Sequence, residues 1–403
     1  MTRRTRPGGL AVAVAALSVA CSSTVSGTAV KAPGAGDGSD GVDLALLDAG
    51  NFPTTPRDPL GTAGDALRGG WAEGRRLAGA VVGPWGVDRD LTGYAQLDSG
   101  VVKDTDAVNA LLGIPMGDAL RGHNLLAGFS SSRHTEKGPY KGLLNIVLEL
   151  ASPADATAAA DEMAAKGATL TMPFDSKPLP TQHFSIPRHP GTDALRFDWT
   201  AQYPAPGGPR FSVTALSAHG QYLLAQTATS ADTADLAAQL IATTLDLQQP
   251  LIDAFKPTPP DQMARLPLDP DGLMARTVAP RPENESINDG IYDAHGALHL
   301  EADDPVHLQA LFKSANVQQV AYVLETRVYQ APDAGAAARI VADMSGPHQV
   351  GGISGMPQAK CFNETLGYWC VARADRYAYE MQNEQENALH QMMAAQYRLL
   401  TGK

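Results

Sequence analysis

The clearest hydrophobic pattern in the chain is a strand followed by a helix between residues 144 and 167. Apolar residues occupy every second position from Leu144 to Leu150, which predicts a strand with one apolar face. Ser152 then offers a helix cap, and proline at the next position suits a first helical turn. Alanine and methionine recur at helical spacing up to Gly167, so we expect a buried helix to end there.

The same order of elements returns in the C-terminal part of the chain. Residues 322–328 alternate as a single strand would, and Asp333 opens a helix that runs towards Met344. Self-similarity of this kind predicts a tandem repeat. Ser230 and Asn383 are the expected caps of the second helix in each copy. A hairpin and that second helix are predicted at residues 211–227 and 230–250 in the first copy, and at 368–381 and 383–400 in the second.

These elements predict an α+β fold built from two tandem repeats. Each repeat is expected to be an antiparallel sheet with helices laid on one side, because that arrangement buries the apolar faces. We expect an N-terminal domain over residues 58–255 and a C-terminal domain over residues 283–403. Residues 256–282 form a Pro-rich linker, which allows the domains either to swing or to pack together.

The first copy carries an insertion at residues 168–192, between its first helix and its hairpin. The insertion is rich in proline and contains His183 and His189. Loops often carry function, so these two histidines are candidate binding residues. The alternative is an inert flap that covers a sheet edge.

The N-terminus has the features of an export signal. Three arginines precede an apolar run from Gly8 to Ala20, which is too short to cross a hydrocarbon core of about 30 Å. Cys21 follows, so we expect a signal peptide at residues 1–20, lipidation of Cys21, and anchoring to the outer face of the cell membrane. Ser18 stands where a lipobox usually has an aliphatic residue, so a secreted protein without the lipid is the alternative.

Residues 21–57 are rich in Ser, Thr, Gly, Ala and Pro, which predicts a flexible tether. Within them, the stretch from Val42 to Leu47 is apolar enough to dock on the folded body, but the composition favours a mobile segment.

Charge restricts the partners of the chain. Its 403 residues include 31 basic and 43 acidic ones, for a net charge of -12. Removal of residues 1–20 would take away three arginines and no acid, which leaves the mature chain near -15. Such a chain is repelled by nucleic acid and by anionic lipid headgroups. We therefore expect no nucleic-acid partner, and membrane contact through the lipid alone.

Two cysteines, Cys361 and Cys370, remain after Cys21. In an exported protein we expect them to form a disulfide that joins neighbouring antiparallel strands. Two buried free thiols are the first alternative. A zinc site is the second, although no further Cys or His pair stands close to them in the sequence.

Catalytic motifs are absent from the sequence. Ser130 follows Gly128 but lacks the second glycine of a nucleophile elbow, and no phosphate loop, dinucleotide fingerprint or His-Glu-x-x-His motif is present. We therefore predict no catalytic residue, no cofactor and no bound metal. One polar cluster could bind a ligand or a divalent ion if folding gathered it, and a solvated polar segment is the alternative. The cluster consists of Asp293, His295, His299, Glu301, Asp303, Asp304 and His307.

Four stretches together resemble a family of actinobacterial, notably mycobacterial, cell-envelope lipoproteins. They are the signal segment ending at Cys21, GRRLAGAVVGPWGVDRDLTG at 74–93, AGFSSSR at 127–133 and DQMARLPLDPDGLMARTVAP at 261–280. The resemblance covers nearly the whole mature chain and implies two tandem domains, but it brings no activity. Each half also resembles small α/β sandwich lipoproteins of these envelopes, related to the PsbP-like and Mog1-like fold, which implies no function.

Two functions from different classes remain. The first is a non-enzymatic binding or scaffold module, whose domains form a groove for an envelope lipid, glycan or protein. The alternative is an envelope hydrolase with an unrecognised site, in which Asp293, His295 and His299 would take part. The lack of a catalytic motif favours the first.

Overall fold

The computed structural model describes residues 40–171, 177–198, 208–280, 282–344, 346, 349–364 and 367–403. The expected signal peptide and Cys21 lie outside these residues. These described residues form one compact unit. Among the described helices, none combines the length and the apolar character needed to cross a membrane.

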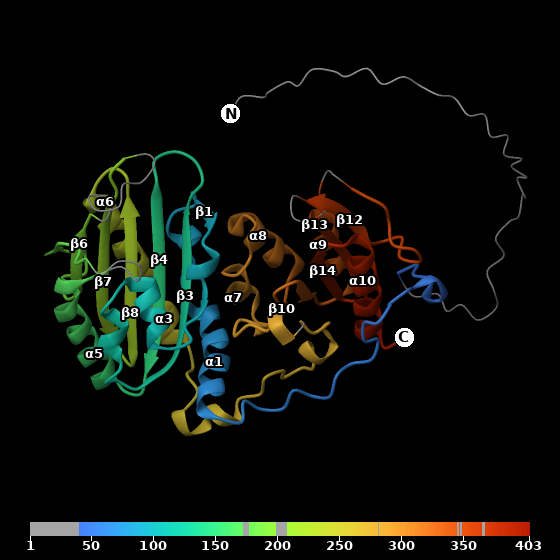
Figure 1. Cartoon of the computed structure of the whole chain (residues 1–403), viewed down its shortest axis with the longest axis horizontal. Helices are drawn as coiled ribbons and strands as arrows, with labels where there is room; N and C mark the ends of the chain where they lie inside the picture. Colours follow the sequence, from blue (N-terminus) through green and yellow to red (C-terminus); the bar gives the residue numbers. More distant parts are fainter. Residues whose placement is uncertain are drawn as a thin grey trace, which may run out of the picture. The chain divides into compact units, whose positions relative to one another are not determined.

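Two antiparallel sheets organise the chain, as the repeat predicted (Figure 1). The first has eight strands in the order β1-β3-β4-β8-β7-β6-β5, with β2 paired to β3. Its hairpin of β7 and β8 turns at Gly220, which has a positive φ of 57°. The strands are β1 Leu91–Tyr94, β2 Gly100–Val101, β3 Leu125–Thr135, β4 Lys141–Leu150, β5 Thr181–His183, β6 Asp193–Phe197, β7 Phe211–His219 and β8 Tyr222–Ser230.

The second sheet has six strands in the order β12-β13-β14-β11-β10-β9. This order repeats that of the first sheet, since β10, β11, β14 and β13 take the places of β3, β4, β8 and β7. Residues 322–328, expected as one strand, are divided between β10 and β11 by a turn at Leu324 and Glu325. The strands are β9 Gly290–Tyr292, β10 Gln319–Val323, β11 Thr326–Gln330, β12 Lys360–Glu364, β13 Gly367–Ala374 and β14 Tyr377–Asn383.

The helices begin close to where the sequence predicted, with three corrections. Ser152 caps α5 and Asp333 caps α9, as expected. Thr233 rather than Ser230 caps α6, which continues past Pro250, and α10 begins after Gln385 rather than at Asn383. The helices are α1 Ala66–Leu77, α2 Pro84–Val87, α3 Thr105–Leu112, α4 Met116–Leu120, α5 Pro153–Lys166, α6 Ala234–Ala254, α7 Ala294–Leu298, α8 Pro305–Ala315, α9 Ala334–Asp343 and α10 Glu386–Thr401.

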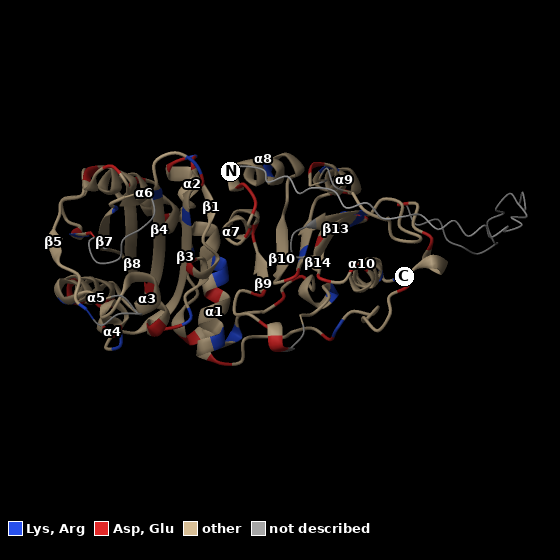
Figure 2. Cartoon of the chain, turned by 45° about the horizontal axis from the view of Figure 1, so that its top comes forward, with Lys and Arg blue, Asp and Glu red and all other residues tan. Residues whose placement is uncertain are grey.

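Helices cover both faces of each sheet, and not one face as expected. Figure 2 shows α6 above the first sheet and α5 below it. Every residue of β4 after Lys141 is buried, with Leu143 and Val147 in the core that contains α6 and Leu144 in the core that contains α5. The polar residues Asn145 and Glu149, which suggested a solvated face, are themselves fully buried.

One hydrophobic core is shared by the two halves of the chain. It contains Trp85 and Phe129 from the N-terminal half together with Tyr292, Leu298 and Leu308 from the C-terminal half. Short 3₁₀ helices within the expected linker also pack on the body. They are η6 Pro260–Arg265, which contains the buried Met263, and η7 Met274–Arg276. The described linker residues therefore belong to the folded body.

The composition of residues 40–57 predicted part of a flexible tether, but these residues are docked on the folded body. Asp40 pairs with Arg373, and the Asp43 amide donates to the Gly355 carbonyl at 2.8 Å. Val42 and Leu47 are buried in the core beneath α10. Burial of the apolar stretch within this segment stabilises the docked position, whereas the Ser- and Gly-rich residues around it have little apolar surface to bury.

A disulfide joins Cys361 on β12 to Cys370 on β13. The two residues are direct partners in the strand register, so the bridge staples a hairpin as predicted from the sequence. It closes a loop of about ten residues, which the loop-entropy model values at somewhat under 3 kcal/mol.

Candidate functional site

His299, one of the candidate binding residues, lies inside the shared core. Its side chain is fully buried, with Nδ1 2.7 Å from the Ser131 hydroxyl and Nε2 3.2 Å from the Ala78 carbonyl. A carbonyl only accepts, so Nε2 carries the proton and Nδ1 accepts from Ser131. Burial lowers the pKa of His299 well below its ordinary value, with His295 and Arg133 acting in the same direction. The imidazole is neutral and both its nitrogens are engaged.

The other two residues of this group also serve the junction between the halves. His295 lies beside His299, with ring centroids 5.1 Å apart, and its Nε2 is 2.8 Å from the Val81 carbonyl. Asp293 accepts from the Gly296 amide and caps α7. The structure thus brings Asp293, His295 and His299 together, but the two imidazoles hold α7 against the N-terminal half and Asp293 caps that helix.

Arg133, in the AGFSSSR segment, is the strongest polar tie at this junction. The side chain is 1% exposed, and Nη1 donates to the Thr92 carbonyl at 2.9 Å. Nη2 donates to the carbonyls of Leu298 at 3.0 Å and Glu301 at 2.6 Å. Burial lowers the pKa of Arg133 to about 10, so the group stays charged at neutral pH. Ser130, in the same segment, is buried and donates to the Gly100 carbonyl.

The histidines of the insertion lie apart from this junction. His183 is exposed on β5, which pairs with β6 at the edge of the first sheet. His189 Nε2 is 2.8 Å from Asp246 on α6, and Arg188 pairs with the same carboxylate. The described part of the insertion therefore extends the sheet and is pinned to α6.

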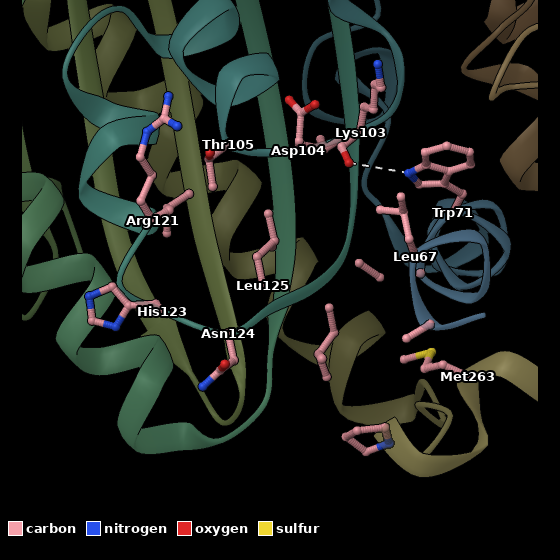
Figure 3. Close-up of a pocket in the computed structure, with 17 residues that line it drawn as sticks. Leu67, Trp71, Lys103, Asp104, Thr105, Arg121, His123, Asn124, Leu125 and Met263 are labelled. Carbon is pink, nitrogen blue, oxygen red and sulfur yellow. Dashed lines mark hydrogen bonds between the residues drawn. The ribbon is translucent and has the colours of Figure 1, made fainter.

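A pocket of about 610 Å³ opens between α1 and the start of β3 (Figure 3). Leu67 and Trp71 project from α1 towards Leu125, and η6 closes one end through Met263. The Trp71 indole donates to the Lys103 carbonyl at 3.3 Å. The apolar lining consists of Ala66, Leu67, Gly70, Trp71, Val102, Leu120, Leu125, Leu126, Ala127, Pro260 and Met263.

Two glycines explain how α1 comes so close to its neighbours. A Cβ at Gly70 would lie 2.2 Å from the Leu126 carbonyl, and one at Gly69 would lie 2.3 Å from the Met263 carbonyl. Only glycine allows both contacts without movement of the backbone. Asp65 starts the helix by accepting from the Arg68 amide at 2.8 Å. The sequence thus fixes one wall of the pocket against β3 and η6.

The polar rim of the pocket carries three basic side chains. Arg121 pairs with Asp106 and Asp118, and His123 Nε2 is 3.2 Å from Glu162. Within the described chain, the exposed Lys103 ammonium has no ion pair. It is therefore the basic group of the rim that is left for the polar end of a ligand.

A second polar site lies in the C-terminal half, around Glu301 and Glu380, here called the glutamate pair. Arg327 on β11 is the register partner of Glu380 on β14, so both side chains point to the same face. Arg327 Nε is 3.4 Å from Glu301 and 3.9 Å from Glu380. The Trp369 indole donates to Glu380 at 2.9 Å. A pocket of about 290 Å³ borders this group.

The glutamate pair shares one hydroxyl. Tyr329 Oη is 2.8 Å from Glu380 Oε1 and 3.3 Å from Glu301 Oε1, and its single proton can serve one carboxylate at a time. Burial raises the pKa of both glutamates, against the opposing effect of Arg327. Two carboxyl groups with raised pKa values at a pocket wall form an arrangement that can support acid–base chemistry.

The described residues contain one group of three potential metal ligands, namely Cys361, Cys370 and His390, within 4.8 Å of one another. His390 lies on α10, twenty residues after the second cysteine, so no short motif in the sequence connects it to the two cysteines. Both sulfurs are bonded to each other. The oxidised chain therefore offers no thiolate to a metal ion.

The pocket was not predicted from the sequence, and neither were most of the residues around the glutamate pair. Glu301 belonged to the polar cluster, but Arg327, Tyr329, Trp369 and Glu380 were not singled out. A signal was present, since a charged residue at the centre of a strand such as β14 needs a partner if both faces are covered. Without knowledge that helices cover both faces, the same pattern indicates a solvated side.

Two family models together match most of the chain. Residues 60–268 match "Domain of unknown function (DUF7373) N-terminal", and residues 273–403 match "Domain of unknown function (DUF7373) C-terminal". Among solved structures, the extracellular domain of PknH from Mycobacterium tuberculosis matches at 14% identity, over 43% of this chain and 94% of that chain, with a TM-score of 0.30. A likeness this distant carries no argument. The search of curated proteins found no match.

Proposed function

The chain belongs to the DUF7373 family, whose function is unknown, and from its own geometry we propose that it is a non-enzymatic binding module. We further propose that it is exported and held at the outer face of the cell membrane by a lipid on Cys21. The signal-like segment at residues 1–20 supports this cellular location. Its ligand is then a component of the cell envelope.

The pocket in Figure 3 is the observation that carries the proposal. Its volume of about 610 Å³ lies in the range of small-molecule sites, and its lining is mostly apolar with few polar groups. Leu67 is 60% exposed and lines the pocket, so its side chain is accessible to a ligand there. An amphiphilic lipid suits this pocket best, with its hydrocarbon against Leu67, Trp71 and Leu125 and its polar end at Lys103.

A fluorescent fatty acid titrated into the whole folded chain tests this function. We expect saturable binding, and we expect Leu67→Asp to weaken it at least tenfold, because the new carboxylate would stand among apolar side chains and repel the ligand's own. A tenfold loss corresponds to about 1.4 kcal/mol. Fluorescence anisotropy gives both dissociation constants.

Leu97→Asp is the matched control for this experiment. Leu97 is 96% exposed and does not line the pocket, so the same substitution there should leave binding unchanged. Circular dichroism of both variants checks that they are folded. Absence of saturable binding to the wild-type chain, or equal binding by Leu67→Asp, would remove the pocket from the proposal.

Hydrolysis of an envelope ester or glycoside is the second candidate, favoured by the glutamate pair alone. Glycoside hydrolysis uses two carboxyl groups on either side of the scissile bond, one of them with a raised pKa as the general acid. If the pair is catalytic, Glu380→Gln should abolish turnover of chromogenic substrates, while Glu162→Gln on α5 should not. A wild-type chain with no turnover across esters, phosphates and glycosides, or activity retained by Glu380→Gln, rules this candidate out.

A further inference from the structure

We propose that a separate cleft at the C-terminal end of α1 binds an organic anion, through a phosphate group. The cleft, here called the basic cleft, has a volume of about 520 Å³ and is lined by Arg75, Arg76, Lys256 and Arg265. It lies on the other side of η6 from the pocket in Figure 3, and the inference does not depend on a ligand there.

The charge of the basic cleft is opposite to that of the chain. Four cationic side chains line it, and no aspartate or glutamate is found among its described lining residues, although the chain as a whole carries -12. Figure 2 shows basic residues along α1, all of which are arginines. Clefts lined by one sign of charge concentrate ligands of the other sign. The net charge of the protein therefore does not exclude a local site for an anion.

Arg75 is the cation that most needs a partner. It is half-buried, and Nη1 donates to the Ile287 carbonyl at 2.8 Å. In the described part of the chain its guanidinium forms no ion pair within 4 Å. The Arg75 side chain packs directly on the Gly290 backbone, since a Cβ at Gly290 would lie 2.5 Å from it. Burial lowers the pKa of Arg75, and Asp289 nearby has a smaller opposing effect, but it forms no ion pair with the guanidinium. A guanidinium held in place with no carboxylate at ion-pair distance is a preorganised donor for an oxyanion.

Arg76 has a different role, because its charge is already neutralised. It pairs with the buried Glu73, donates to the Thr258 hydroxyl at 2.8 Å and to the Lys256 carbonyl at 3.2 Å. These bonds hold the rim of the cleft against α1. The surplus positive charge then comes from Arg75, Lys256 and Arg265. Lys256 and Arg265 are exposed, and the described chain provides neither of them with an ion pair.

The walls of the basic cleft indicate the kind of organic group to which the phosphate is attached. Pro257, Pro259 and Pro267 face the cavity together with Leu266 and Ile291, so its sides are apolar and stiff. The cavity is also much larger than a free phosphate ion. A phosphate ester with a compact organic body fits both features, and it can come from a soluble metabolite or from the headgroup of a lipid.

Calorimetric titration of the whole folded chain with glycerol phosphate tests the basic cleft. We expect saturable binding, with an affinity at least tenfold lower in the double variant Lys256→Gln/Arg265→Gln. We also expect the affinity of the wild-type chain to fall as salt is added. Both residues are exposed, so the variant should fold normally. The double variant Lys313→Gln/Arg339→Gln, on α8 and α9, removes the same charge elsewhere and should bind as the wild type does.

Flotation with phosphatidylglycerol vesicles separates the two sources of the phosphate. Binding of glycerol phosphate identifies a soluble ester as a sufficient ligand, whereas vesicle binding alone, lost in the cleft variant, identifies a lipid headgroup. The proposal fails if neither probe binds, or if the control variant loses as much binding as the cleft variant. Neither failure bears on fatty-acid binding in the pocket of Figure 3.

Discussion

Replacing Arg133 by methionine should lower the free energy of unfolding by about 3–5 kcal/mol. Methionine fills much of the volume but leaves three buried carbonyls, those of Thr92, Leu298 and Glu301, without the donor they share. The guanidinium also lies over the rings of Trp85 and Tyr94 at 5.5 and 4.7 Å, and these contacts are lost as well. Urea unfolding followed by circular dichroism measures the change.

Arg196→Met on β6 is the control for this substitution. Arg196 belongs to the same sheet, but its side chain has no hydrogen bond or ion pair with the rest of the described chain, so the expected change is about 0.5 kcal/mol or less. Arg133→Lys keeps the charge without the forked donors and should fall between the wild type and Arg133→Met. A loss below about 1 kcal/mol in Arg133→Met would show that the two halves are joined chiefly by apolar contacts.

Glu149→Gln should stabilise the protein at pH 8 by about 2–3 kcal/mol and have little effect at pH 5. Burial raises the pKa of Glu149 to about 7, and Glu73 nearby acts in the same direction. Its Oε1 accepts from Gln221 at 2.9 Å, but Oε2 has no partner. A neutral amide at this position therefore removes the cost of a buried carboxylate.

The direction of this effect follows from the raised pKa. The folded chain binds the Glu149 proton more tightly than the unfolded chain, so this stabilisation is complete below pH 4.5 and is lost as the pH rises to about 7. The difference between Glu149→Gln and the wild type should grow over that interval and then stay constant. Urea midpoints at several pH values between 5 and 8 measure it.

Asp48→Asn is the control for the pH series. Asp48 is an exposed carboxylate whose pKa is lowered by hydrogen bonds from the Gln391 side chain and the Gly50 amide. It is ionised throughout this range in both the folded and unfolded chain, so its effect should not vary with pH. A wild-type and a Glu149→Gln chain with parallel stability curves would contradict the expected pKa.

The elements of the fold were predictable because their signals are local. Alternating apolar residues, a serine or aspartate before each first helix and a tight turn at Gly220 lie within a few residues of one another. The packing of helices on both faces of each sheet could not be predicted from such local signals. Asn145 and Glu149 look like solvent-facing residues until Val82, Gln226 and other distant groups bond to them. Likewise, docking of residues 40–57 depends on Arg373, far along the chain.

The sites were less predictable than the fold, because each is assembled from distant segments. The polar cluster at residues 293–307 was visible in the sequence, but His295 and His299 bond to the N-terminal half, whereas His307 is exposed. The pocket combines α1, the start of β3 and η6, which no short motif connects. The basic cleft depends on Arg75, whose lack of a carboxylate partner is a property of the folded chain and not of its sequence.

The tie at Arg133 also determines the order in which the protein can fold. The Leu298 and Glu301 carbonyls that it binds lie 165 and 168 residues further along the chain. During synthesis the N-terminal half emerges with this cation and the apolar side chains around it uncovered, and the partners that complete it are made last. Contacts over such separations slow folding and prolong the exposure of sticky intermediates. A fragment ending at residue 268 should therefore aggregate, and fusions or truncations should keep both halves together.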